Sequence, residues 1–195
     1  MMKFSCEKAL LQSAIAVTSR AVAAKSSIPA LEGLLLHAGE ALTVSGYNMQ
    51  TGIRTRISAD VAEPGELVLN ARLFGDIIRR MPDDVITFSA DDRCTVHLSC
   101  GDADFDILGL SAGDYPELPE VEDEYGLTIP QKTLRAMIEE TAFAVSTTKS
   151  RPVPTGPLFD TADINLPMAA VDGFRPGVRP APAVPAHAVC PTCPA

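Results

Sequence analysis

The chain has 195 residues, 46% of them apolar, and a formal charge of −9. This length supports one large domain or two small ones, and the composition excludes a disordered chain. No run of 18 apolar residues is present, and Glu7 and Lys8 fall where a signal peptide needs its apolar core. Five cysteines without a framework spacing fit reduced thiols, so we expect a cytoplasmic protein without a transmembrane helix.

The first 125 residues alternate between predicted strands and two predicted helices. A helix over residues 7–23 follows a short strand, because apolar residues recur there at helical spacing. Asn70 is a suitable N-cap for the second helix, which we expect to end before Pro82. Alternating apolar and polar residues predict strands over residues 31–38, 41–48, 51–61, 65–71, 84–90, 94–100 and 103–110. An acidic connector that contains two prolines, residues 111–126, ends this part.

The rest of the chain repeats the beginning. A shift of 123 residues, which becomes 124 after one inserted residue, superimposes these pairs: Leu11 and Leu134, Ile15 and Ile138, Thr18 and Thr141, Gly33 and Gly156, Leu42 and Leu166, Asn48 and Asp172. A period this long indicates a duplicated domain. We therefore predict one domain at residues 1–125, a partial second copy at 126–175, and a disordered Pro/Ala-rich tail at 176–195. Prolines at 154, 157 and 167 stand where the repeat places strands, which predicts a damaged second copy.

Two motifs suggest chemistry that their surroundings do not support. Gly109–Gly113 has the GxSxG pattern of a nucleophile elbow, but an acidic, proline-containing segment follows where that site needs a helix. The alternating carboxylates of residues 102–106 begin like an EF-hand loop, yet Ile107 and Gly113 replace the required glycine and glutamate. A loop that closes a strand and the solvent face of a strand are the simpler interpretations.

Cys190 and Cys193 form a lone CxxC in the tail. His187 supplies a third possible zinc ligand, but the sequence offers no fourth, and a redox site needs a helix start after a strand. A metal or redox protein therefore remains an alternative hypothesis, and we expect no cofactor.

Basic residues gather on the predicted helices, whereas acidic residues gather on the strands and the connector. This pattern allows a net-acidic protein to present a positive surface to phosphates without reading base sequence. No tryptophan accompanies these bases, which favours duplex DNA over stacked single strands. The bases concerned are Arg20, Lys25, Arg72, Arg79, Arg80, Lys132, Arg135, Lys149 and Arg151.

Six separated segments resemble, in order and spacing, the bacterial sliding clamp, the beta subunit of DNA polymerase III. They are MKFSCEKALLQSAIAV, SSIPALEGLLL, NARLFGDIIRRMP, GDYPELP, LTIPQKTLRAMI and AVDGFR, and together they cover residues 2–175. The resemblance implies an α+β DNA-clamp fold, with two helices packed on antiparallel sheets in each domain, present here as one complete and one incomplete copy. It also implies a non-catalytic homodimeric ring that encircles duplex DNA and tethers the replicative polymerase.

The resemblance assigns roles to individual residues. The DNA-channel positions fall on Lys25, Arg72, Thr148 and Lys149, and the helix-end cation Arg20 joins them. A pocket for short peptides of the polymerase and clamp loader falls on Pro154, Val171, Gly173, Phe174, Arg175 and Pro176. Pro154 and Pro176 stand where that pocket has leucine-like residues, and Pro176 stands where a returning strand should begin.

The chain departs from the family in its second half. The second helix of domain two and all of a third domain lack counterparts, which predicts a truncated or frameshifted clamp unable to close a two-chain ring. An inert fragment, or one that caps and poisons a full-length ring, remains the alternative to a DNA-tethering subunit. We also expect Ile138, Phe143 and Phe159 to leave an exposed apolar surface.

Overall fold

The computed structural model describes residues 1–119, 129–146, 155–160 and 167–180. The chain divides into two compact units, Met1–Pro119 and Glu120–Ala195. The expected boundary lay at residue 125, which falls outside the described residues, as do Thr148, Lys149, Pro154 and the CxxC with His187.

The first unit contains two antiparallel sheets. The five-stranded sheet has the order β5-β1-β7-β8-β9, and the four-stranded sheet has the order β4-β3-β2-β6. The predicted strands are confirmed, with one correction: the single strand expected over residues 51–61 is divided into β4 and β5, which belong to different sheets. Alternating residues along the strands enter the core. Their bounds are β1 Met2–Glu7, β2 Gly33–Ala38, β3 Leu42–Tyr47, β4 Gly52–Ile57, β5 Asp60–Glu63, β6 Gly65–Asn70, β7 Val85–Ala90, β8 Thr95–Cys100 and β9 Ala103–Leu108.

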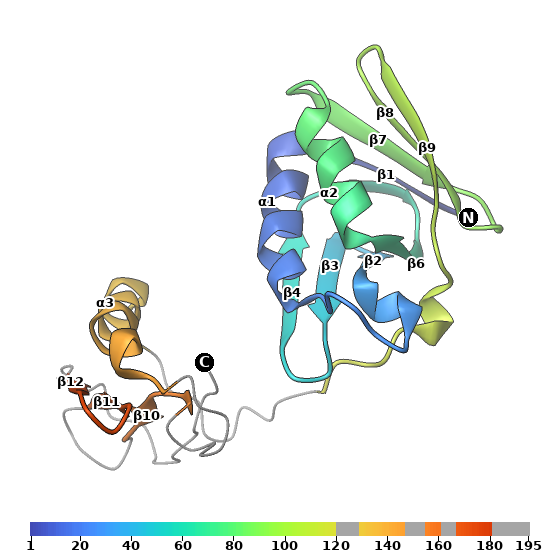
Figure 1. Cartoon of the computed structure of the whole chain (residues 1–195). Helices are drawn as coiled ribbons and strands as arrows, with labels where there is room; N and C mark the ends of the chain where they lie inside the picture. The colour runs from blue at the N-terminus through green and yellow to red at the C-terminus, as the bar shows by residue number, and fades with distance from the viewer. Residues whose placement is uncertain (120–128, 147–154, 161–166, 181–195) are drawn as a thin grey trace. The chain divides into compact units, whose positions relative to one another are not determined.

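Two helices, α1 (Lys8–Thr18) and α2 (Ala71–Arg80), lie side by side and pack on these sheets (Figure 1). The Asn70 side chain caps α2 by accepting a hydrogen bond from the Leu73 amide at 3.0 Å, as predicted. The core lies between the helices and the sheets, where Phe4 and Phe88 stack with their ring centroids 4.5 Å apart. The two helices therefore form one continuous layer, and their outer faces are left to solvent.

The end of α1 approaches β3 closely through backbone atoms. The short 3-10 helix η1 (Ser19–Ala21) extends α1, and a Cβ placed on Gly46 would lie only 2.2 Å from the carbonyl oxygen of Thr18. No side chain larger than hydrogen fits between the two elements. Gly46 thus allows the end of α1 to approach the four-stranded sheet closely.

The second unit confirms the repeat in three dimensions. Helix α3 (Gln131–Thr141) and the 3-10 helix η5 (Ala142–Ala144) begin and end 123 residues after α1 and η1. Thr18 and Thr141 are both fully buried, and each hydroxyl donates to the carbonyl oxygen four residues earlier, at 2.7 and 2.8 Å. A three-stranded sheet follows, with β10 (Leu158–Phe159), β11 (Met168–Val171) and β12 (Pro176–Arg179) in that order.

Three described prolines of the second unit lie at or directly before the start of a strand, and for Pro157 and Pro167 this corrects the expectation that they interrupt strands. Pro157 directly precedes β10, Pro167 directly precedes β11, and Pro176 is the first residue of β12. At such a position a strand tolerates a residue without an amide hydrogen. The prediction that the disordered tail begins at residue 176 is therefore wrong for Pro176–Arg179, which pair with β11.

Candidate nucleic-acid interface

Five exposed cations lie on or next to the helix layer of the first unit, and we call them the helix-layer cations. Arg20 belongs to η1, Lys25 follows it, and Arg72, Arg79 and Arg80 project from α2. Between α1 and α2 runs a groove of about 270 Å³. Its polar lining residues are Gln12, Ser19, Arg72, Asp76 and Arg79, and its apolar lining comes from Ile15 and small residues. The structure thus brings Arg72 and Arg79 to one surface feature, with Asp76 as an ion-pair partner of Arg79.

Not every base near α1 contributes to this surface. Lys8 is 9% exposed, and its ammonium group forms an ion pair with Asp83 at 2.7 Å. It therefore joins α1 to the end of the neighbouring α2–β7 connection and does not face solvent as a free cation. Sequence alone could not reveal this pairing, because the two residues are 75 positions apart.

The predicted separation of bases on helices from acids on strands is only partly correct. Arg54 and Arg56 lie on β4, and Arg56 pairs with Glu40 at 3.1 Å. On α3 the bases Lys132 and Arg135 are balanced in number by Glu139 and Glu140. Arg135 pairs with Glu139 at 2.8 Å, and Glu140 pairs with Arg179 of β12 at 3.2 Å. The excess of positive charge is therefore a property of α2 and of the residues that follow α1.

The helix-layer cations suit electrostatic contact with phosphates. Arginine and lysine side chains that extend into solvent can reach phosphate oxygens without contacting base edges. No aromatic residue lines the groove between α1 and α2, so the groove offers no platform on which an unpaired base could stack. The arrangement matches the chemistry of duplex-backbone binding.

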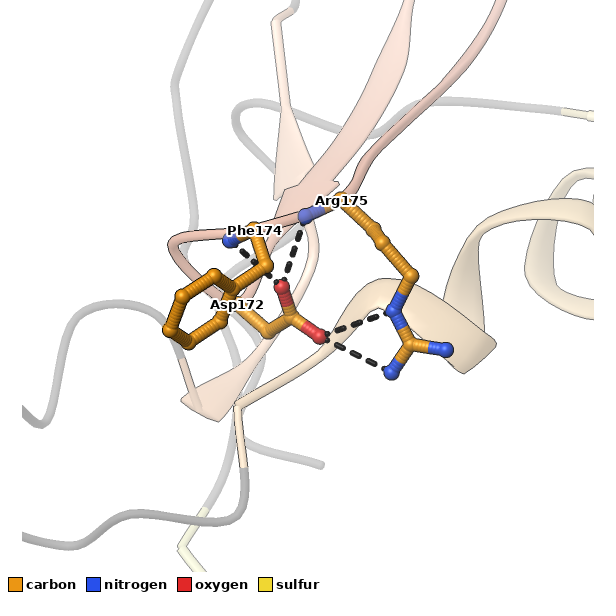
Figure 2. A network of polar contacts seen from close by, with 3 residues as sticks. All are labelled: Asp172, Phe174 and Arg175. Atoms are coloured by element: carbon orange, nitrogen blue, oxygen red, sulfur yellow. Dashed lines mark hydrogen bonds and ion pairs between the residues drawn. The ribbon is translucent and has the colours of Figure 1, made fainter.

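The second predicted site, the corner between β11 and β12, is held together by Asp172 (Figure 2). One carboxylate oxygen accepts hydrogen bonds from the amides of Phe174 and Arg175, both at 2.8 Å. The other oxygen accepts two bonds from the Arg175 guanidinium, at 3.2 and 3.0 Å. These backbone amides, and then the guanidinium, lower the pKa of Asp172 to about 2.

The corner presents its aromatic residue to solvent. Phe174 is 95% exposed, and Gly173 adopts a positive φ of 95° with open space where a Cβ would lie. Val171 is half exposed, and Pro176 is exposed at the start of β12. Of the predicted pocket, the structure brings together the residues from Val171 to Pro176, whereas Pro154 lies outside the described residues.

Sequence reasoning recognised Asp172 and Gly173 as a turn signal, but it did not include Asp172, the residue that builds the corner, among the predicted site residues. A usable signal was present, because an Asp or Asn side chain commonly accepts from amides two and three residues later. The repeat carried the same signal: Asn48, its counterpart, accepts from the amides of Gln50 and Thr51 at 3.0 and 2.7 Å. The two corners therefore have the same construction.

The remaining motifs form ordinary structure. Ser111 Oγ accepts from the Gly113 amide at 3.3 Å at the start of a short 3-10 helix, so Gly109–Gly113 does not form a nucleophile elbow. On β9, Asp104 and Asp106 flank the His97 ring at 3.6 and 2.9 Å. Among the residues described, no cluster of three or more His, Cys, Asp or Glu side chains could hold a metal ion. No helix within that part of the chain is long and apolar enough to cross a membrane.

The family described as "DNA polymerase III beta subunit, N-terminal domain" matches residues 2–119. The chain is 33% identical to the beta sliding clamp of Halalkalibacterium halodurans over 84% of its length and 46% of that protein. It is 35% identical to the beta sliding clamp of Synechocystis sp. over 93% of its length and 49% of that protein.

Solved structures agree with these matches. The sliding clamp of Bacillus subtilis superimposes with a TM-score of 0.93 at 28% identity, over 99% of this chain and 54% of that one. A DNA polymerase III beta subunit from Eubacterium rectale gives the same TM-score and identity. The chain spans about half the length of the relatives that it matches. With its two-helix layer on antiparallel sheets and its repeated unit, the chain belongs to the family of bacterial beta sliding clamps.

Proposed function

We propose that this chain is a non-catalytic DNA-binding subunit of the sliding-clamp type, acting in DNA replication as a processivity factor. Its first unit contacts duplex DNA through the helix-layer cations, and its second unit contributes Thr148 and Lys149. The observation that supports the proposal is that Arg72, Arg79 and Arg80 are exposed on α2, while Arg20 and Lys25 are exposed in and just after the 3-10 helix that extends α1.

The physical argument rests on counterion release. Each phosphate that a cation neutralises releases condensed counterions, so binding weakens steeply as salt rises and depends little on base sequence. A subunit that slides along DNA needs this kind of contact, because base-specific hydrogen bonds would hold it at one site. With few cations engaged, we expect a Kd of about 10⁻⁴ to 10⁻⁶ M, the range of non-specific association.

The test compares two double variants that remove the same charge from different places. Lys25→Ala/Arg72→Ala removes two helix-layer cations, and Arg54→Ala/Arg56→Ala removes two cations from the outer side of β4. Fluorescence anisotropy with a labelled duplex at several salt concentrations gives the affinity and its salt slope. We expect the helix-layer variant to bind more weakly, with a salt slope shallower by about 0.9 for each phosphate that the variant no longer neutralises.

The β4 variant should bind like the unchanged chain. An equal loss of DNA affinity in both variants would show that binding depends only on net charge, which would contradict a specific role for the helix-layer cations. Binding that does not change with salt would contradict the proposal itself and would favour an inert fragment.

We further propose that the corner at Val171–Pro176 contributes to binding short peptides of the replicative polymerase and the clamp loader. The support is its exposed apolar content, since Phe174 and Val171 both face solvent on a turn that Asp172 holds in one shape. An apolar side chain on a rigid turn can bind a peptide with little loss of conformational entropy. Replacing Phe174 by alanine should weaken the capture of such peptides.

A further inference from the structure

The segment Tyr115–Leu118 binds the first unit mainly through two side chains. Tyr115 is 7% exposed and packs with Ala30, Leu31, Tyr47 and Val68 in an apolar cluster separate from the main core. Leu118, three residues later, packs against the same cluster. Between them Pro116 is half-buried and Glu117 is exposed, so the segment contacts the unit at its two ends.

Few hydrogen bonds reinforce this contact. The Tyr115 amide bonds within its own short turn, to the Ala112 carbonyl oxygen, and its hydroxyl donates to the Ser45 carbonyl oxygen at 3.4 Å. Residues 116–119 belong to no helix or strand. Burial raises the pKa of Tyr115 to about 12, as expected for a phenol kept from water. The segment therefore lies on the unit as a ligand would, held by a tyrosine and a leucine.

The surface under the segment is shaped to receive it. Gly52, the first residue of β4, lacks a side chain where Leu118 lies: a Cβ there would be 2.9 Å from Leu118 Cδ2 and 3.4 Å from the Tyr47 ring. Gly52 follows the corner that Asn48 builds, so the site has a rigid turn on one side. The 3-10 helix η2 (Pro29–Glu32) supplies the remaining wall through Ala30 and Leu31.

The repeat provides a described counterpart for one residue of this surface. Tyr47 corresponds to Val171 at the same shift that places Asn48 on Asp172. Tyr47 is 9% exposed under Tyr115 and Leu118, whereas Val171 is 50% exposed. At this position the side chain is thus covered in the first unit and half exposed in the second.

We propose that the first unit carries a peptide-binding site that its own residues Tyr115–Leu118 occupy as an intramolecular ligand. The site accepts an extended segment with an aromatic residue and, three residues later, a leucine. Attachment through the chain gives the segment an effective concentration in the millimolar range, so it holds the site closed against weak competitors. This site is independent of the DNA contacts and of the corner at Asp172.

The test supplies the segment in trans. A Tyr115→Ala/Leu118→Ala variant of the full chain empties the site, and a synthetic peptide of residues 111–119 is titrated into ¹⁵N-labelled variant and unchanged protein. Two anchoring side chains predict weak binding, with a Kd on the order of 10⁻⁴ M. We expect amide shifts at Ala30, Leu31, Tyr47 and Val68 in the variant and none of comparable size in the unchanged protein.

A second peptide, with alanine in place of both tyrosine and leucine, should cause no shifts. If the double variant does not fold, Leu118→Ala alone loosens the segment while leaving the buried tyrosine in place, and the peptide should then bind more weakly at the same amides. The proposal is overturned if a folded variant shows no shifts, if shifts appear only around Val171 and Asp172, or if the unchanged protein binds equally well.

Discussion

At the scale of single residues, one side chain determines the shape of each exposed corner. Asp172 and Asn48 each use one side-chain oxygen to accept hydrogen bonds from the backbone amides two and three residues later. Asp172 differs because its second oxygen also binds Arg175. Its pKa of about 2 lies below the ordinary aspartate value, so its carboxylate stabilises the folded corner above that ordinary value and loses this effect as pH falls toward 2.

Replacing Asp172 therefore separates the roles of its two oxygens. Asp172→Asn keeps an acceptor for the amides, as Asn48 does in the first unit, and we expect it to preserve the turn while freeing Arg175. Asp172→Ala should expose the Phe174 and Arg175 amides and speed their hydrogen exchange several-fold. In the unchanged protein these amide shifts should titrate with a midpoint near pH 2, and a midpoint at the ordinary aspartate value of about 4 would contradict the assigned contacts.

Gly46 offers a second prediction at this scale. Gly46→Ala places a Cβ against the Thr18 carbonyl oxygen, where backbone atoms on both sides resist movement, so we expect a loss of about 1–3 kcal/mol in the free energy of unfolding. Gly113→Ala is the matched control, because its Cβ would lie 3.6 Å from Ser111 Oγ and its φ is not positive. Urea denaturation compares the two, and equal effects would mean that the approach of α1 to β3 is not tight.

At the scale of elements, the repeat places one helix in two environments. Ile15 of α1 is 4% exposed, and its Cγ2 lies 3.3 Å from where a Cβ on Gly75 of α2 would be. Ile138 of α3, its counterpart, is 44% exposed. The expected apolar exposure at Ile138 and Phe143 is confirmed, whereas Phe159 is partly buried against Met137 and Met168.

Ile15 and Ile138 occupy equivalent positions of the repeated helix, so replacing each of them measures how much packing contributes to stability at that position. Ile15→Ala removes a fully packed side chain and should cost about 2–5 kcal/mol in the stability of the first unit. Ile138→Ala removes a side chain already in contact with water and should cost less than about 1 kcal/mol in the second unit. Urea unfolding monitored through amides of each unit measures the stability loss of each variant. A large loss for Ile138→Ala would indicate that the Ile138 side chain is covered rather than exposed.

The sequence predicted the elements well where local pattern determines them. Helix α2 was bounded correctly because Asn70 and Pro82 are strong local signals. The tail strand β12 was missed because proline was expected to break a strand, and only the pairing with β11 shows that Pro176 occupies a position needing no amide donor. Pairings between distant residues, such as Lys8 with Asp83, leave no local pattern to read.

At the scale of the molecule, the chain combines a net charge of −9 with a helix layer rich in cations. Net charge alone argues against a nucleic-acid partner, but the positions of Arg72, Arg79 and Arg80 on one helix show that the charge is not spread evenly. The sequence also placed Arg54 and Arg56 on a predicted strand, apart from the helices, and β4 confirms this. It could not show that Arg56 pairs with Glu40.

No aromatic residue lines the groove between α1 and α2. This predicts a preference between duplex and single-stranded DNA. A duplex presents phosphates on two strands to the helix-layer cations, whereas a flexible single strand gains most from stacking, which this groove does not provide. We expect a duplex to bind more tightly than its single strands at equal salt, and AT-rich and GC-rich duplexes to bind within about twofold of each other. Competition anisotropy measures this preference, and tighter single-strand binding would contradict it.

The uneven placement of charge also bears on how an encounter with DNA begins. Acidic side chains such as Asp104 and Asp106 lie on β9, whereas the arginines lie on α2. A separation of opposite charges of this kind produces an electric dipole. In the field of a polyanion such a body experiences a torque before it makes contact, and it turns its cationic layer forward. Orientation during approach raises the rate of productive collisions even when the total charge opposes them. Moving an arginine from α2 to the opposite surface, with composition unchanged, would therefore slow association.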